Sequence, residues 1–216
     1  MLKDGGDDKC RMCCEYVETV GHLVGACSKM AQTDYRRRHD RMGLRVYWEM
    51  CGRLGLKRSG KWYEETPDPV RKRGDGMAEI WWDQKVCTPT AFQANRPDMV
   101  VIDWKRRSWV MVDFAVPCDA NVAKKEEEKV HKYKDLATEA AHMNAVKVVG
   151  VPIVGGALGV VSKKLVGWLK ILGIEEESVV GELQTAALIG TVAILKKVLD
   201  SGVGDRRRDV GVRLVR

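Results

Sequence analysis

The sequence predicts an α/β domain with a small metal-binding segment before it and a helical extension after it. Three observations support this fold class. Cysteine and histidine cluster in the first 27 residues, strand-like and helix-like runs alternate over residues 77–160, and the runs after residue 160 have helical periodicity. With 216 residues, of which 45% are apolar and 31% charged, the chain is long enough for one sizeable core and a small appendage.

Residues 1–28 are predicted to form a CCHC zinc knuckle. Cys10, Cys13, His22 and Cys27 follow the spacing C-x2-C-x8-H-x4-C. Thiolate and imidazole are the ligands that tetrahedral zinc prefers, and a short turn brings the first two thiolates to one side of the metal. A segment this short cannot bury a core, so bound Zn2+ would supply its folding free energy. Cys14 directly follows Cys13 and could replace it as a ligand.

Cysteine usage and the polar amino-terminal residues predict a reducing compartment, the nucleus or the cytoplasm, and not secretion. Four of the seven cysteines lie in the first 27 residues and the others are scattered singly, a pattern more typical of metal binding than of disulfides. The stretch MLKDGGDDKC lacks the apolar core of a signal peptide. No apolar run is expected to span a membrane; residues 146–161 come nearest, and Lys147 and Pro152 interrupt them.

Residues 29–76 are predicted to form a basic helical linker. Ser28 could cap a helix that runs to Leu56, and residues 59–76 are expected to be a loop. Between residues 35 and 74 there are 12 Lys and Arg against 5 Asp and Glu, a difference equal to the net charge of +7. Such a concentration favours a polyanion, because neutralising phosphates releases counterions; a solubilising surface is the alternative. The arginines expected to contact nucleic acid are Arg36, Arg37, Arg38, Arg41 and, further along, Arg96.

Residues 77–160 are predicted to form the α/β core. The expected elements are a helix over residues 78–86, a hairpin of strands at 99–103 and 109–116, a helix over 121–144 and a buried strand at 146–154.

The helical extension is expected over residues 161–200, followed by a basic tail over 201–216. Two sets of apolar residues recur at helical spacing and predict two buried faces. The sets are Leu165, Trp168, Leu169 and Leu172, and then Leu188, Val192, Leu195 and Leu199.

Two aspartates are predicted to face each other across the hairpin. If the turn is centred between Lys105 and Arg106, opposing residues have numbers that sum to 211, as 98 and 113 do. Asp98 and Asp113 would then lie on neighbouring strands about 5 Å apart at Cβ. Like charges this close are destabilising unless a cation bridges them, and Mg2+ is the natural bridge. Such a site can activate water and stabilise the leaving oxygen in phosphodiester hydrolysis. The alternative is a strand end where Asp113 meets solvent or an arginine.

The helix after the hairpin carries the expected cationic partner. Lys129, Lys132 and Tyr133 fall on one broad helical face in EKVHKYKDL. Either lysine could reach the carboxylates and position the attacking water, and a solvated lysine face is the alternative. His39 and His131 are expected to be surface histidines. Four tryptophans could stack on bases, although core packing is expected for most of them: Trp48, Trp62, Trp81 and Trp82.

Taken together in this order, the knuckle, the RPD of residues 96–98, the strand ending VDFAVP and the KYKDL helix resemble a known family. They are similar to the carboxy-terminal part of the reverse transcriptase polyprotein of site-specific non-LTR retrotransposons, the type with a restriction-like endonuclease. The stretches CSKMAQTDYRRRHDR, KWYE, VVGVPIVGGALGVVSKKL and LQTAALIGTVAILKKVL extend the resemblance from Cys10 to about Leu199.

The resemblance implies a PD-(D/E)xK nuclease fold that nicks target DNA to prime reverse transcription, with a DNA target and element RNA as partners. Its two acidic ligands correspond to Asp98 and Asp113. Its catalytic lysine, displaced onto the helix, corresponds to Lys129 or Lys132 with Tyr133 beside it; the usual lysine position holds Ala115.

Three further features bear on this expectation. Asp83 corresponds to an acidic position that is either a third ligand or a structural cap. Cys14 stands where the pattern usually has glycine. The 216 residues contain no reverse transcriptase palm, so a fragment, a truncated copy or a separate reading frame is expected. The alternative function is a nucleic-acid-binding protein that no longer cuts.

Overall fold

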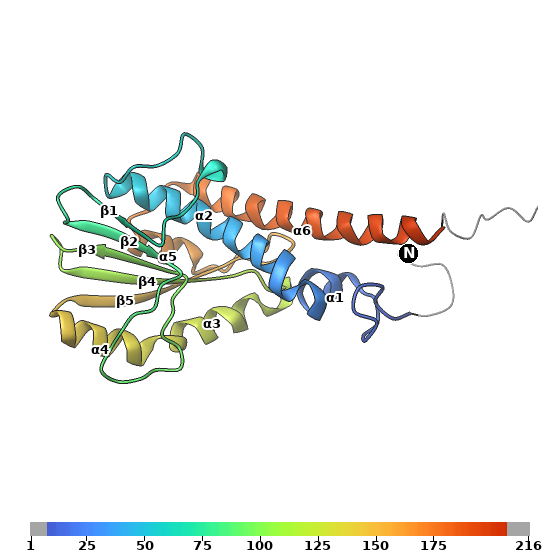
Figure 1. Cartoon of the computed structure of the whole chain (residues 1–216), viewed down its shortest axis with the longest axis horizontal. Coiled ribbons are helices and arrows are strands. Elements are labelled where there is room, and N and C mark those ends of the chain that lie inside the picture. Colours follow the sequence, from blue (N-terminus) through green and yellow to red (C-terminus); the bar gives the residue numbers. More distant parts are fainter. Residues whose placement is uncertain (1–7, 207–216) are drawn as a thin grey trace, which may run out of the picture.

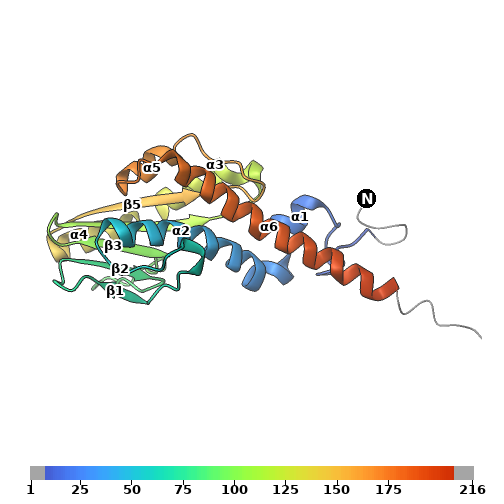
Figure 2. The same ribbon diagram turned by 90° about the horizontal axis from the view of Figure 1, so that it is seen from above.

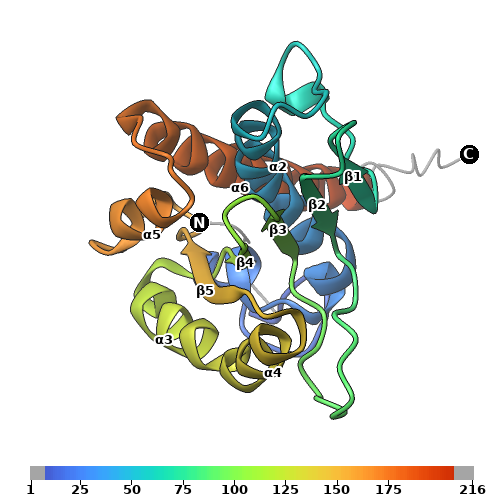
Figure 3. The same ribbon diagram turned by 90° about the vertical axis from the view of Figure 1, so that its left-hand side faces the viewer.

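The computed structural model describes residues 8–206, in which one β-sheet lies between two layers of helices (Figure 1). The predicted mixed α/β class is confirmed. Helices α2 (Arg36–Arg53), α5 (Leu165–Ile171) and α6 (Glu177–Arg206) cover one face of the sheet, and α3 (Val122–Lys132) and α4 (Lys134–Asn144) cover the other (Figure 3). The expected tail falls largely on residues 207–216, which lie outside the described residues.

The sheet has five strands in sequential order. They are β1 (Val70–Lys72), β2 (Ala78–Trp82), β3 (Met99–Asp103), β4 (Ser108–Ala115) and β5 (Lys147–Val154). The first four are antiparallel to their neighbours, whereas β5 is parallel to β4. A parallel pair needs a crossover, and α3 and α4 provide it. The strands predicted at 99–103, 109–116 and 146–154 are confirmed to within a residue or two.

The prediction of a helix over residues 78–86 is wrong, because this segment contains β2. Ile80 contributes to the core on the α2 side, whereas Trp81 packs against the core on the α4 side. This alternation and the aromatic content favour a strand. β2 also pairs with β1, which lies in the stretch expected to be a loop.

The hairpin register is confirmed. Met99 pairs with Val112, Val101 with Val110 and Asp103 with Ser108. The numbers in each pair sum to 211, because the turn is symmetric about Lys105 and Arg106. Asp98 and Asp113 occupy the next position of the same register.

The single helix expected over residues 121–144 is two helices. Tyr133, between α3 and α4, has φ −113° and ψ 14°. Its side chain is 4% exposed, and its hydroxyl donates a hydrogen bond to the Arg96 carbonyl at 2.8 Å. The break between α3 and α4 therefore lies where the Tyr133 side chain is anchored beside the RPD segment.

The segment predicted as a linker is part of the main core. Short helical turns at Ser28–Met30 and Ala31–Tyr35 lead into α2, which buries Val46, Tyr47 and Met50 against the sheet and α6. Gly43 does not interrupt α2; it allows close approach to the sheet, because a Cβ there would lie 2.8 Å from the Trp82 ring.

Helix α6 runs beside α2 and continues past the sheet toward the amino-terminal segment (Figure 2). The α5 face is confirmed, with Leu165, Leu169 and Leu172 buried. The prediction of a buried face for α6 is wrong, because Leu188, Val192 and Leu199 are 40%, 62% and 52% exposed. The small residues of α6 face α2 instead, which lets the two helices pack closely: they include Ala186, Ala187 and Gly190.

One segment, other than the residues 146–161 named above, meets the length and composition of a membrane span. The stretch Glu177–Ser201 of α6 is long and apolar enough by length and composition, with a mean hydropathy of 1.6, and 33% of its most apolar window is buried. Core helices pass the same test, and α6 packs on α2.

Candidate functional site

The predicted knuckle ligands lie together. One ligand atom from each of Cys10, Cys13, His22 and Cys27 lies within 4.8 Å of the others, and all four residues are buried. The Cys10 and Cys27 sulfurs are 4.0 Å apart, and the Cys13 sulfur is 3.3 Å from His22 Nε2. Tetrahedral bonds of about 2.3 Å to sulfur and 2.1 Å to nitrogen would give about 3.8 and 3.6 Å. The cluster could therefore hold a metal ion.

Local structure selects which cysteine joins the cluster. Cys14 is exposed and has φ +59°, a left-handed conformation in which glycine is unstrained. This explains why glycine suits the position. The Cys14 side chain faces solvent, so Cys13 and not Cys14 joins the cluster. Thr19 then caps α1 (Val20–Gly25) by accepting a hydrogen bond from the His22 N–H.

The metal-binding segment packs against the rest of the protein. Its buried residues, including Leu23 and Met30, share one apolar cluster with Ile194 and Val198 of α6. Tyr35 ties the segment to α2, since its hydroxyl donates to the Leu23 carbonyl and accepts from the Cys27 N–H. Folding of the segment that holds the four ligand residues is therefore linked to its packing on α6.

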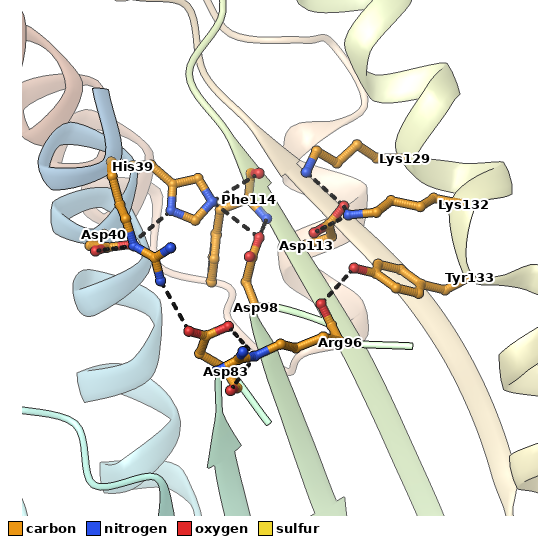
Figure 4. Close-up of polar contacts among 11 residues, drawn as sticks. His39, Asp40, Asp83, Arg96, Asp98, Asp113, Phe114, Lys129, Lys132 and Tyr133 are labelled. Atoms are coloured by element: carbon orange, nitrogen blue, oxygen red, sulfur yellow. Dashed lines mark hydrogen bonds and ion pairs between the residues drawn. The ribbon is translucent and has the colours of Figure 1, made fainter. Parts of the chain in front are cut away.

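The second predicted site lies where β3 begins and β4 ends (Figure 4). Asp98 Oδ2 accepts a hydrogen bond from the Phe114 N–H at 2.7 Å. The Asp113 side chain is 3% exposed, and the two carboxyl groups are near enough for each to shift the pKa of the other. The sheet register therefore brings the two acids together as predicted.

Both predicted lysines reach this acid pair from α3. Lys129 Nζ lies 2.7 Å from Asp113 Oδ2, and Lys132 Nζ lies 3.3 Å from the same oxygen. Lys129 has a side chain 12% exposed, whereas that of Lys132 is 40% exposed. Lys129 also lines the cleft that Asp98 lines, and Lys132 does not. Geometry thus distinguishes the two lysines, which the sequence left as alternatives.

His39 is a member of the site that the sequence analysis missed. Its Nε2 lies 3.1 Å from Asp98 Oδ2 and its Nδ1 lies 2.9 Å from Asp40 Oδ1. The expectation of a surface histidine is wrong. His39 stands one helical turn before Gly43. A glycine inside a helix can mark a close approach to a neighbouring element, and this is the sequence signal that could have placed His39 beside the sheet.

The pKa values of the two acids are shifted in opposite directions. Burial alone would raise the pKa of Asp98, but hydrogen bonding and attraction to His39 outweigh it and hold that pKa well below its usual range. Burial and then repulsion from Asp98 raise the pKa of Asp113, against the attraction of Lys129. Burial would also lower the pKa of His39, but its bonds to Asp40 and Asp98 raise it to about 9. The site therefore joins an ionised Asp98 to a protonated His39.

A cleft of about 630 Å³ opens beside these residues. Its walls come from the segment before α2, from α2 itself, from the ends of β2 and β4, and from α3. Its cationic side chains include Arg36, Lys124, Lys125 and Lys129. Four carboxylates line the same cleft, those of Asp40, Asp83, Asp98 and Glu128, so its surface carries charge of both signs. An anionic ligand would meet cationic side chains on two walls, Arg36 from α2 and the lysines of α3.

The predicted nucleic-acid-binding arginines have different surroundings. Arg38 is 1% exposed and donates hydrogen bonds to Thr191 and to the Val24 and Val116 carbonyls. Its expected contact with nucleic acid is therefore wrong, because its guanidinium links α2 to α6, to α1 and to the loop after β4. Arg37 is exposed, and Arg41 is half-buried over the Trp62 ring.

Arg36 and Arg96 both form ion pairs with Asp83, at 3.0 and 2.8 Å. Asp83 has φ +50° and lines the cleft, but its carboxylate is held by these two arginines. This arrangement matches the structural alternative for Asp83 more closely than the third-ligand alternative.

A comparison with protein-family models found no match to this chain, and a comparison with curated proteins found none either.

Proposed function

We propose that this chain is a metal-dependent DNA endonuclease region of the kind found in non-LTR retrotransposon polyproteins, with a restriction-like core that nicks target DNA. The observation that carries the proposal is the convergence of Asp98, Asp113 and Lys129 beside a cleft, from two adjacent strands and the following helix. The order of motifs along the chain, which resembles that family, supports the same proposal.

The acid pair suits a divalent cation. Two carboxyl groups in contact repel each other, and this repulsion contributes to the raised pKa of Asp113. Asp98 and Asp113 would hold Mg2+, which prefers a few carboxylates together with water and phosphate oxygens. When bound there, the ion would stabilise the charge that develops on the phosphodiester.

The other residues have distinct roles in this proposal. Lys129 would orient the attacking water and hold positive charge near the phosphate, since it lies on the cleft wall and contacts Asp113. His39 would position Asp98, because it shares the Oδ2 oxygen with the Phe114 N–H. Arg36, Arg37, Lys124 and Lys125 would contact the DNA backbone or element RNA, with affinity that falls steeply as salt rises.

In the same proposal the cysteine–histidine cluster holds Zn2+. Three thiolates and one imidazole in a buried tetrahedral set suit zinc better than hard cations, which prefer oxygen ligands. Because the cluster is docked on α6, zinc would stabilise the wall of the cleft that the segment before α2 supplies.

One observation favours the alternative of a nucleic-acid-binding protein without cleavage activity. Two lysines surround the Asp113 carboxylate, which is almost fully buried, while Asp98 Oδ2 already accepts two hydrogen bonds. If these partners do not yield to a cation, the cleft would bind DNA and leave it intact.

Nicking of supercoiled plasmid tests the two functions. The zinc-loaded protein should nick only with Mg2+, and Asp98→Ala should abolish nicking while retaining DNA in a gel-shift assay. Asp103→Ala is the matched control, because it removes a carboxylate at the other end of β3. Salt-sensitive DNA binding without nicking by the wild type would overturn the nuclease proposal and leave the binding alternative.

A further inference from the structure

A second cavity, of about 470 Å³, lies between α2, the turn at residues 62–64 and α6. The functional site described above uses none of its aromatic residues. Its lining includes Arg37, Arg41, Trp62 and Tyr63. The volume is in the range of pockets that hold a small molecule or a single nucleotide.

The aromatic side of this cavity is accessible. Tyr63 is 52% exposed and packs edge-to-face on Trp62, with ring centroids 5.7 Å apart. The Arg41 guanidinium lies 5.5 Å from the centroid of the same indole. The Trp62 ring is thus held in place by its neighbours. Tyr63 stays half-exposed even with the Lys61 ammonium 5.6 Å from its ring centroid, so part of the ring remains open for a base to stack on.

Two arginines of the cavity could pair with an anionic ligand. Neither Arg37 nor Arg41 forms an ion pair with a carboxylate among the residues that the structure describes, and Arg41 Nε is buried without a hydrogen-bond partner there. The two lining acids are already engaged, Asp34 with Lys197 and Asp40 with Arg36 and His39. Four arginines line the cavity against these two acids, so an anionic ligand would find an excess of positive charge.

The cavity adjoins the cleft of the proposed nuclease site. Gln32, Arg36 and Asp40 line both of them, so the first turns of α2 form a shared wall. A chain of nucleotides that occupied the cleft could continue over this wall into the cavity.

We infer that this cavity binds an unpaired nucleotide of a single-stranded nucleic acid, with the base stacked on Tyr63 and the phosphate beside Arg37 and Arg41. Stacking on an aromatic ring requires an exposed base face, which a paired base inside a duplex lacks. The place of this strand beside the cleft rests on the proposed nuclease function, whereas the binding itself requires no cleavage.

The test is fluorescence anisotropy with labelled oligothymidylate and oligouridylate, using the full chain with Asp98→Ala so that no probe is cut. Tyr63→Ala should weaken binding of at least one probe by about 5- to 100-fold, the range expected for one stacked base. Tyr63→Phe should bind like the parent, because the ring is kept. The probe with the larger loss identifies the occupant as DNA or RNA.

Salt dependence tests the phosphate contact. Arg37→Ala should reduce the slope of log affinity against log salt by about 0.7, the value for one phosphate of a single strand. Arg106→Ala is the control, since it removes an 83% exposed arginine at the hairpin turn, and it should leave the Tyr63-dependent part of binding unchanged.

Two outcomes would overturn the inference: equal affinity of Tyr63→Ala and its parent for both probes, or an equal loss for duplex and single strands. Neither depends on plasmid nicking. A protein that fails to nick but loses single-strand binding on Tyr63→Ala would overturn the nuclease proposal and support this inference.

Discussion

The two candidate metal sites of this protein are built in opposite ways. The cysteine–histidine cluster takes four buried ligands from 18 consecutive positions of one segment, residues 10–27. The acid–lysine site takes Asp98 and Asp113 from neighbouring strands, Lys129 from α3 and His39 from α2. The first is closed and has a complete set of ligands. The second borders a cleft, and its two acids are balanced by cations of the protein.

This difference separates a structural site from a functional one. A closed set of four ligands leaves no position for substrate, as in structural zinc sites. An acid pair beside a cleft leaves room for water and phosphate oxygens. Removing a metal from the first site should therefore change stability, whereas altering the second should change activity.

Cys27→Ser should have the largest effect on stability. It removes one of four ligands, so bound zinc should fall from one equivalent to nearly none. A metal present at a thousandfold excess over its dissociation constant stabilises the folded state by about 4 kcal/mol, and that contribution should be lost. Metal analysis and denaturant unfolding measure both quantities. Cys14→Ser is the matched control, because Cys14 is exposed and lies outside the cluster; equal effects of the two variants would contradict the assignment of Cys13 as the ligand.

Lys129→Ala should have the largest effect on activity among the lysine variants. A group that positions or deprotonates the attacking water contributes at least about 100-fold, so the nicking rate should fall by that factor. Lys132→Ala, which removes a longer and more exposed ion pair to the same Asp113, should cost less than about tenfold. A larger loss of nicking rate for Lys132→Ala than for Lys129→Ala would assign the water-positioning role to Lys132.

What the sequence could predict differs between the two sites. Ligand spacing within one short segment sufficed for Cys10, Cys13, His22 and Cys27, because local turns bring them together. The acid pair was predictable only because the hairpin is symmetric, so that one sum fixes the register. The distinction between Lys129 and Lys132 needed the observed burial and the cleft.

Contacts between distant segments could not be predicted in the same way. His39 lies 59 residues from Asp98 in sequence, and no periodicity links them. Arg38 resembles its exposed neighbours in sequence, yet it is buried where Gly190 of α6 leaves room. The apolar stripe on α6 was misassigned because close packing with α2 depends on small residues, which hydrophobicity alone does not distinguish.

The pH dependence of stability should test how the protein balances its acid pair. The pKa of His39 is raised from 6.5 to about 9 in the folded state. Its stabilising contribution should therefore be complete below pH 6.5, decline as pH rises toward 9, and be lost above it. The shift corresponds to at most about 3 kcal/mol, and about 1–2 kcal/mol is expected because 26% of the side chain is exposed. Unfolding of the wild type and His39→Gln, measured without divalent cations over this range, should show a difference that narrows with pH. A difference independent of pH would exclude an ion pair between His39 and Asp98.

Tyr133→Phe should have the smallest effect, and it tests whether a residue expected to be catalytic is instead structural. The Tyr133 hydroxyl is directed to the Arg96 carbonyl, and burial followed by the charges of Asp113 and Asp98 raises its pKa well above the usual range. The hydroxyl therefore stays protonated near neutral pH and does not serve as a general base. Its removal should cost about 1 kcal/mol of stability, the value of one lost hydrogen bond. Tyr47→Phe is the control, since the buried Tyr47 hydroxyl has no hydrogen-bond partner among the described residues and its loss should be neutral. Nicking by Tyr133→Phe should stay within a few-fold of the wild type. A loss as large as that of Lys129→Ala would mean that the Tyr133 hydroxyl positions more than the RPD segment, and that the acid–lysine site extends to the break between α3 and α4.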